Sequence, residues 1–122
     1  MTIKPRILVV EDQALLLLDL VDQLNELGFD AVPASSARSA AHLLNARFDA
    51  LVTDIELGDG PNGLTLARLA HGRNPAMPIV VVSGGVTPRA RDLPHGARFV
   101  PKPYRIEHIL SALEQQTVAH AA

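Results

Sequence analysis

The apolar run Phe48-Asp49-Ala50-Leu51-Val52-Thr53-Asp54 stops on an aspartate, and the turn-forming segment Ile55-Glu56-Leu57-Gly58-Asp59-Gly60-Pro61-Asn62-Gly63 follows it directly. A short apolar run that ends at turn residues predicts a buried strand, which we expect at residues 50–54. Ligands of open α/β sheets bind outside the carboxyl ends of such strands. Asp54 is therefore the first candidate for a functional residue.

Four further segments have the composition of strands. Residues 7–10 and 79–83 are both rich in β-branched residues, and residues 7–10 form an apolar run without alternation, which is typical of a central parallel strand that is covered on both faces. Residues 98–100 form a shorter run of the same kind. Residues 29–34 contain Pro33, which cannot donate a ladder hydrogen bond, so we expect this strand at an edge of the sheet.

Apolar residues at helical spacing lie between these strands. The first predicted helix ends at Gly28, and its apolar positions are Leu16, Leu17, Leu20, Val21, Leu24 and Leu27. A second helix is expected over residues 37–46, capped by Ser35 or Ser36, and a third over residues 63–71 with Leu69 in its apolar register. The last predicted helix begins near Ile106.

Strands that alternate with helices predict an α/β fold, with a five-stranded parallel sheet, right-handed crossovers and helices on both faces in three layers. Pro88 and Pro94 leave room for at most about two helical turns between the strands at residues 79–83 and 98–100, so the fourth of the five expected helices, which lies there, is expected to be shortened. With 122 residues, the chain has the size of one domain over residues 1–122. Residues 1–5 and 117–122 are expected to be loosely ordered tails.

The composition narrows the classes of function. The chain has no cysteine, which excludes disulfides and thiolate metal sites and agrees with a cytoplasmic location. A formal charge of -2 without a basic block gives no electrostatic reason to expect direct nucleic-acid binding. We expect no secretory signal and no membrane span, because residues 1–10 hold only a brief apolar run and acids interrupt the leucine-rich segment after it. A protein is the expected partner.

Polar residues follow the predicted strands at their carboxyl ends. Because these ends share one edge of a parallel sheet, they gather Glu11, Asp12, Asp54, Ser83 and Lys102. Three neighbouring carboxylates repel one another unless a cation intervenes, and such oxygen ligands suit Mg²⁺. A lysine, a hydroxyl and a metal ion beside one aspartate are what phosphoryl transfer requires, with the carboxylate as the nucleophile.

This ordered set resembles the receiver domains of two-component response regulators, which belong to the CheY-like superfamily. The resemblance covers essentially the whole chain and is carried by Glu11-Asp12, Asp54, Ser83, Phe99 and Lys102-Pro103. It implies the flavodoxin-like strand order 2-1-3-4-5, which is carried over from the family. It also implies a stand-alone receiver that acts as a signalling switch.

The resemblance assigns the chemical roles. It implies that Asp54 accepts a phosphoryl group from a histidine kinase or a histidine phosphotransfer protein. Mg²⁺, or Mn²⁺ in its place, is then held by Glu11, Asp12, Asp54 and the backbone carbonyl of Glu56. Lys102 is expected to pair with the phosphoryl oxygens.

Three further residues take switch roles by the same resemblance. Ser83 is expected to hydrogen-bond the phosphoryl group in the active state, and Phe99 to reorient when the hydroxyl moves. Pro103 is the candidate for a cis peptide bond, which is essentially a proline feature.

Two segments depart from the family pattern. The family's proline and glycine after the phosphoacceptor are replaced here by Gly58 and Asn62, with Gly63 one residue late. Glu56 and Asp59 add negative charge beside the site, so we expect an altered phosphate lifetime. The interval from residue 83 to residue 102 is short, so neither the family's output partners nor its dimers carry over.

Three functions compete on the sequence alone. The leading one is a phosphorylation-driven switch, which is no enzyme apart from its own phosphorylation from a donor and its own dephosphorylation. The second is a phosphate sink or a phosphorylation-independent adaptor with the same fold. The third is a nucleotide- or flavin-binding enzyme, but Glu11-Asp12-Gln13 stands where a glycine-rich phosphate loop is required.

Overall fold

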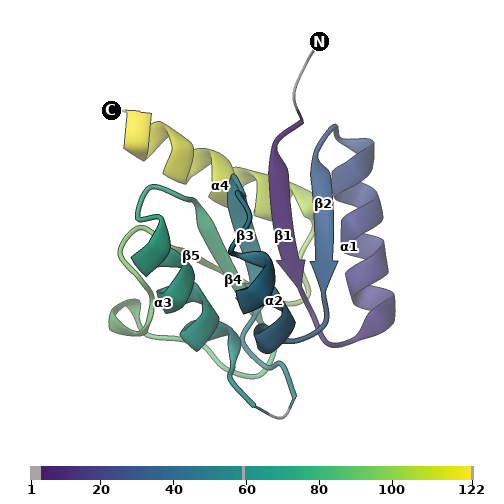
Figure 1. Ribbon diagram of the computed structural model, residues 1–122, viewed down its shortest axis with the longest axis horizontal. Coiled ribbons are helices and arrows are strands. Elements are labelled where there is room, and N and C mark those ends of the chain that lie inside the picture. The colour runs from purple at the N-terminus through teal and green to yellow at the C-terminus, as the bar shows by residue number, and fades with distance from the viewer. Residues whose placement is uncertain (1–3, 59, 122) are drawn as a thin grey trace.

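The computed structural model describes residues 4–58 and 60–121, which form one parallel sheet between two layers of helices (Figure 1). The strands are β1 (Arg6–Val10), β2 (Asp30–Ala34), β3 (Ala50–Asp54), β4 (Ile79–Ser83) and β5 (Arg98–Pro101). Every neighbouring pair is parallel, and the order is β2-β1-β3-β4-β5. The expected α/β class and the strand order 2-1-3-4-5 are therefore confirmed.

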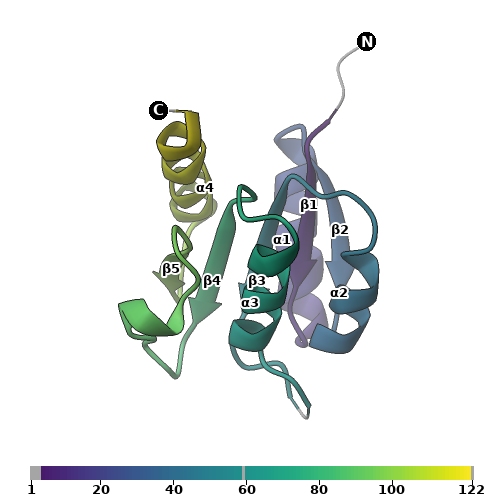
Figure 2. The same cartoon turned by 60° about the vertical axis from the view of Figure 1, so that its left-hand side comes forward.

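Burial along the strands explains this order. Every residue of β3 and β4 is buried, as is β1 after its first residue, because helices cover both faces of these strands. In β2 exposed and buried positions are mixed, and Pro33 lies opposite Val9 in the outermost pairing. Figure 2 shows β2 and β5 at the two opposite edges of the sheet. The edge position predicted from Pro33 is correct.

Within the described residues, four α-helices form the two outer layers. Helices α1 (Ala14–Glu26) and α4 (Ile106–Ala121) pack on one face, where Leu17, Leu24 and Ile109 join a core cluster with strand residues. Helices α2 (Ala37–Leu43) and α3 (Gly63–Arg73) pack on the other, in a cluster that includes Ala40 and Ala67. These two hydrophobic clusters pack the helices against both faces of the sheet.

Some predicted details of the helices are wrong. Leu16, Leu27 and Leu69 are exposed by 44%, 52% and 37%, although the spacing placed them on buried faces. Consecutive leucines at residues 15–18 fit more than one helical stripe, and tertiary packing selects the stripe through Leu17. Helix α2 ends at Leu43, earlier than the expected residue 46, and α3 continues to Arg73.

The short helix that was expected between β4 and β5 is reduced to less than one α-helical turn. Residues 84–96 contain only the 3-10 turn η1 (Ala90–Asp92), where Asp92 is fixed by a 2.9 Å hydrogen bond from Arg68 Nη2 to its carbonyl. At the C-terminus, α4 continues through residues 117–121, part of the segment expected to be a loose tail. Residues 1–3, 59 and 122, and the side chains of residues 115 and 117–121, lie outside the described part of the chain.

Candidate functional site

The acidic pair at the end of β1 is held by the neighbouring edge strand. The Glu11 amide donates to the carbonyl of Ala34 at 3.1 Å, which continues the β1–β2 pairing by one residue. The Glu11 side chain is buried, and its Oε1 accepts a hydrogen bond from the Gln13 amide at 3.2 Å. Asp12, the next residue, is exposed. One acid therefore points inward and the other toward solvent.

Asp54 is the last residue of β3 and is only 3% exposed. Its backbone is paired with Val82 of β4, which fixes the position of its carboxylate at the sheet edge. The Oδ1 atom accepts a hydrogen bond from the Glu56 amide at 3.4 Å. The residue that the sequence singled out at a strand end is therefore a buried carboxylate, held in place by the pairing of its backbone with β4.

Lys102 brings the end of β5 to these acids. Its amide donates to the carbonyl of Ser83 at 3.0 Å, and the Lys102-Pro103 bond is cis, as predicted. Its Nζ donates to Asp54 Oδ2 at 2.6 Å and to Glu11 Oε2 at 3.1 Å. One ammonium group thus bridges two buried carboxylates from different strands.

The electrostatics of this cluster follow from its burial. Burial raises the pKa of Asp54 above its ordinary value, the neighbouring Glu11 raises it further, and the hydrogen bond from Lys102 lowers it only in part. Burial alone lowers the pKa of Lys102, but the bonds to Asp54 and Glu11 outweigh that effect, so its pKa is raised. Lys102 therefore stays charged at neutral pH.

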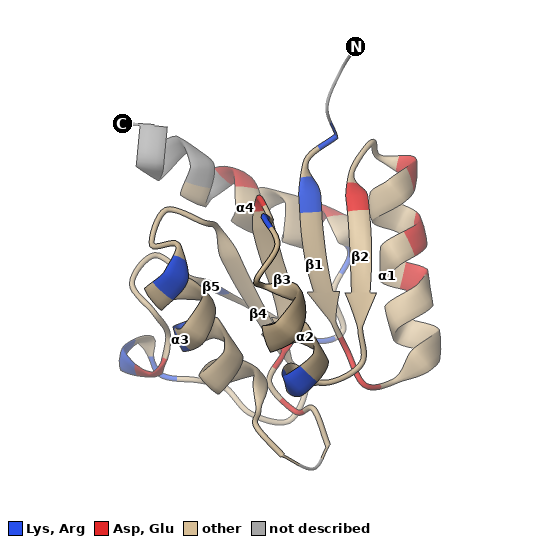
Figure 3. Cartoon of the chain, viewed as in Figure 1, with Lys and Arg blue, Asp and Glu red and all other residues tan. Residues whose placement is uncertain are grey.

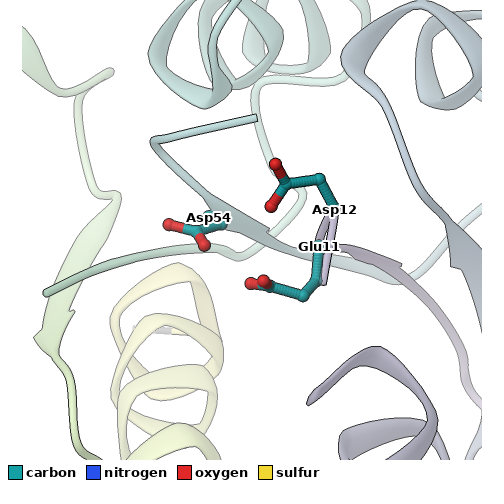
Figure 4. A group of neighbouring side chains, drawn as sticks. All are labelled: Glu11, Asp12 and Asp54. Carbon is teal, nitrogen blue, oxygen red and sulfur yellow. The ribbon is translucent and has the colours of Figure 1, made fainter. Parts of the chain in front are cut away.

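The three acids also meet the requirements of a divalent metal site. Figure 4 shows Glu11, Asp12 and Asp54 close together, and one carboxylate oxygen from each lies within 4.8 Å of the others. Hard oxygen donors, one of them on the exposed Asp12, fit Mg²⁺. The donor set present in the structure therefore suits the ion predicted from the sequence.

Ser83 ends β4 beside this cluster and is 2% exposed. Its hydroxyl donates to Glu56 Oε1 at 2.6 Å and accepts from the Val86 amide at 2.9 Å. The family resemblance implied a metal-binding role for the backbone carbonyl of Glu56, and its side chain was expected only to add negative charge beside the site. The contact made by its side chain was missed, because no spacing rule brings residue 56 to residue 83.

Gly63 has a structural role that the sequence did not reveal. A Cβ atom added there would lie 1.8 Å from the carbonyl oxygen of Asp54, and the Gly63 amide donates to the Ile55 carbonyl at 2.9 Å. Helix α3 therefore begins in direct contact with the backbone of the candidate phosphoacceptor. Only a residue without a side chain fits there.

Phe99 and the loop acid Asp59 are the remaining predicted residues. Phe99 lies in β5 opposite Val81, half-buried, and lines a surface groove with Pro101 and His108. Asp59 lies outside the described residues. The structure therefore brings together the acids, Ser83 and Lys102, and sets Phe99 on the neighbouring strand.

A surface groove lies beside the site, and a row of acids runs along the neighbouring helix α1. A groove of about 710 Å³ lies between α1 and the start of α4, next to Lys102, and includes Leu16, Tyr104 and Ile106. Burial raises the pKa of the Tyr104 phenol. Figure 3 shows a row of acids along α1, which are the exposed Asp19, Asp22 and Glu26.

The fold and this site define a doubly wound α/β protein with an acid and lysine cluster at the carboxyl edge of its sheet. The model of the response regulator receiver domain family matches residues 7–114. The chain therefore belongs to the response regulator receiver domain family, whose members take part in two-component, phosphorylation-dependent signalling. Its resemblance to that family is confirmed.

Curated relatives agree with this assignment. The virulence transcriptional regulatory protein PhoP of Salmonella typhimurium is 34% identical over 113 residues, which are 89% of this chain and 50% of that protein. The transcriptional regulatory protein PhoP of Escherichia coli is 32% identical over 113 residues, again 89% of this chain and 50% of that protein. The chain spans about half the length of these relatives.

Solved structures show the same fold. A response regulator receiver protein from Sinorhizobium medicae superimposes with a TM-score of 0.84 at 32% identity, covering 96% of this chain and 97% of the other. The receiver domain of the hybrid histidine kinase CckA gives a TM-score of 0.76 at 27% identity, covering 92% of this chain and 98% of the other.

Within the described residues, every helix is too short or too polar to cross a membrane.

Proposed function

We propose that this chain is a signalling switch that accepts a phosphoryl group on Asp54 and then changes the surface it presents to a protein partner. One observation carries the proposal, namely that the buried Asp54 carboxylate shares the Lys102 ammonium group with Glu11, with 2.6 Å between Lys102 Nζ and Asp54 Oδ2. A fixed cation in a buried site stabilises the charge that develops on transferred phosphoryl oxygens.

The transfer is a displacement at phosphorus. An oxygen of the Asp54 carboxylate bonds to the phosphorus of a phosphohistidine, while the phosphorus–nitrogen bond breaks and the imidazole nitrogen keeps the electron pair. Lys102 pairs with the phosphoryl oxygens during this step. In self-dephosphorylation, water attacks the same phosphorus, inorganic phosphate is released and the Asp54 carboxylate is restored.

Glu11, Asp12 and Asp54, with the backbone carbonyl of Glu56, are the proposed ligands of Mg²⁺ or Mn²⁺. The proximity of the three carboxylates supports this assignment. When bound, the ion neutralises phosphoryl oxygens. The carboxylates of Glu11 and Asp54 are buried and would bind the ion from the protein side. The carboxylate of Asp12 is exposed, so this side of the site faces solvent.

Ser83 and Phe99 are the proposed switch residues. After phosphorylation, the Ser83 hydroxyl hydrogen-bonds the phosphoryl group, and Phe99 reorients in response. Two observations support this pairing: Ser83 ends the strand that neighbours β3, and Phe99 pairs with Val81 of the same strand.

The expected donor is a histidine kinase or phosphotransfer protein in the cytoplasm, and the downstream target is a protein.

A small phosphodonor tests the proposal. Acetyl phosphate with Mg²⁺ should label the wild-type chain, and both Asp54→Asn and the addition of a chelator should abolish the label. Asp22→Asn is the matched control, because Asp22 is an exposed aspartate of α1 away from the strand ends. Equal labelling of the wild type and Asp54→Asn contradicts the assignment.

A second candidate function is a phosphate sink, or an adaptor that works without phosphorylation. The single 3-10 turn η1 favours it, because residues 84–96 offer little regular structure for a phosphorylation-dependent surface. Capture of partners by the phosphorylated and unphosphorylated chains separates the two functions. A switch binds its target preferentially in one form, whereas a sink has no form-specific target and an adaptor binds equally in both.

A further inference from the structure

We propose that the side chain of Glu56 is a positioning residue that keeps the Ser83 hydroxyl engaged until Asp54 is phosphorylated, and so opposes the active state. This inference rests on the proposed function, in which Ser83 turns to the phosphoryl group. It concerns the carboxylate of Glu56, which is distinct from the backbone carbonyl proposed as a metal ligand.

The bond between these residues is short and charge-assisted. Ser83 Oγ donates to Glu56 Oε1 at 2.6 Å, within the range of hydroxyl-to-carboxylate bonds, which are about twice as strong as neutral ones. A serine hydroxyl has a single proton to donate. While Glu56 accepts that proton, Ser83 has none to give to a phosphoryl oxygen.

The local backbone favours this engaged arrangement. The Val86 amide donates to the same Ser83 oxygen at 2.9 Å, so the hydroxyl is held from two sides in a position that is 2% exposed. A Cβ on Gly85 would lie 3.2 Å from Glu56 Oε1, so a glycine at that position leaves room for the carboxylate. The end of β4 and the loop that follows it, residues 83–86, therefore accommodate the Glu56 side chain.

Phosphorylation of Asp54 would disrupt the same contact. Glu56 follows Asp54 by two residues, and its amide already contacts Asp54 Oδ1 at 3.4 Å. A phosphoryl group places further negative charge beside the Glu56 carboxylate and competes for the Ser83 proton, and like charges repel. Because Glu56 is exposed, its side chain can turn into solvent. The strength of the Ser83–Glu56 bond therefore subtracts from the stability of the active state.

A double-mutant cycle tests this inference. The probe is beryllium trifluoride with Mg²⁺, a non-covalent mimic of the phosphoryl group, and its affinity is followed by nuclear magnetic resonance of the backbone amides. Glu56→Ala should tighten binding about tenfold, which is the size expected when a competing charged hydrogen bond is removed. Glu56→Gln, which keeps an acceptor oxygen without the charge, should have an intermediate effect.

The Ser83→Ala background separates positioning from simple repulsion. There Glu56→Ala should tighten binding much less, and in the unbound wild type the Val86 amide resonance should move on Glu56→Ala substitution. Equal tightening in both backgrounds, or no tightening in either, overturns the role of Glu56 while leaving the proposed function intact. A wild-type chain that does not bind the probe at all overturns the proposed function, and the role of Glu56 with it.

Discussion

At the scale of single residues, the site is a compromise between burial and charge. Asp54 and Glu11 are both buried, and Lys102 is the cation that bridges them. An ionised carboxylate in this position is costly to the folded state even with its partner, since burial and Glu11 raise its pKa. If Asp54 is the phosphoacceptor proposed above, the chain keeps this acid at a cost in stability, as is common in functional sites.

The pH dependence of stability should reveal that cost. Because the folded-state pKa of Asp54 is raised, its contribution to stability is full below the ordinary pKa of an aspartate and is lost as the pH rises through the folded-state value. Asp54→Asn, which stays neutral, should therefore melt at a higher temperature than the wild type at pH 7, and the difference should shrink toward pH 3. Thermal melts of both chains across this range measure it. A lower melting temperature for Asp54→Asn at pH 7 would contradict the assignment of a destabilising charge.

Gly63 gives a second prediction at this scale. Gly63→Ala should lower the free energy of unfolding by about 3 kcal/mol, because the new methyl group overlaps the carbonyl oxygen of Asp54. Gly72→Ala, in the same helix with nothing within 4 Å of the added atom, should stabilise the chain by about 0.5–1 kcal/mol. Urea titrations of both variants check this contrast, and equal effects would refute it.

At the scale of elements, the sequence predicted most where residues are buried on both sides. The bounds of β3 and β4 follow directly from their uninterrupted apolar runs, and Pro33 marks β2 as an edge strand. The sequence did not determine which face of α1 is buried, because its consecutive leucines are compatible with several apolar stripes along the helix. The contact between Glu56 and Ser83 could not be predicted, because it depends on the paths of two loops rather than on strand ends.

The start of α2 supplies a matched pair of variants. Ser36 Oγ accepts a hydrogen bond from the Ser39 amide at 3.1 Å, so Ser36 is the N-cap and the alternative, Ser35, is exposed. Ser36→Ala should cost about 1 kcal/mol of unfolding free energy, and Ser35→Ala less than half as much. Chemical denaturation distinguishes them. The opposite ranking would place the cap at Ser35.

At the scale of the whole molecule, the sheet converts distant sequence positions into one site. Residues 11, 54 and 102 meet because three parallel strands end at a common edge, and the helices on both faces hold that edge in register (Figure 1). In the proposed function, phosphorylation at this edge would act on β4 and β5 together, since Ser83 and Phe99 belong to neighbouring paired strands. This coupling is the physical basis of the proposed switch.

Binding of Mg²⁺ should stabilise the folded chain as a whole. At a concentration ten times the Kd, the gain expected from mass action is about 1.4 kcal/mol, because the unfolded chain does not gather the three acids. Asp12→Asn should reduce this gain, and Asp22→Asn, on the outer side of α1, should leave it unchanged. Thermal melts over a series of Mg²⁺ concentrations measure the effect. A similar gain in Asp12→Asn would show that Asp12 is not a ligand.

The most direct test of the central claim is to find which residue carries the phosphoryl group. After incubation with acetyl phosphate and Mg²⁺, intact mass spectrometry should detect the addition of one phosphoryl group, and peptide mapping should locate it on Asp54. The addition should disappear when Mg²⁺ is chelated and in Asp54→Asn. A phosphoryl group on another residue, or none on a chain that melts cooperatively and binds Mg²⁺, would contradict the account.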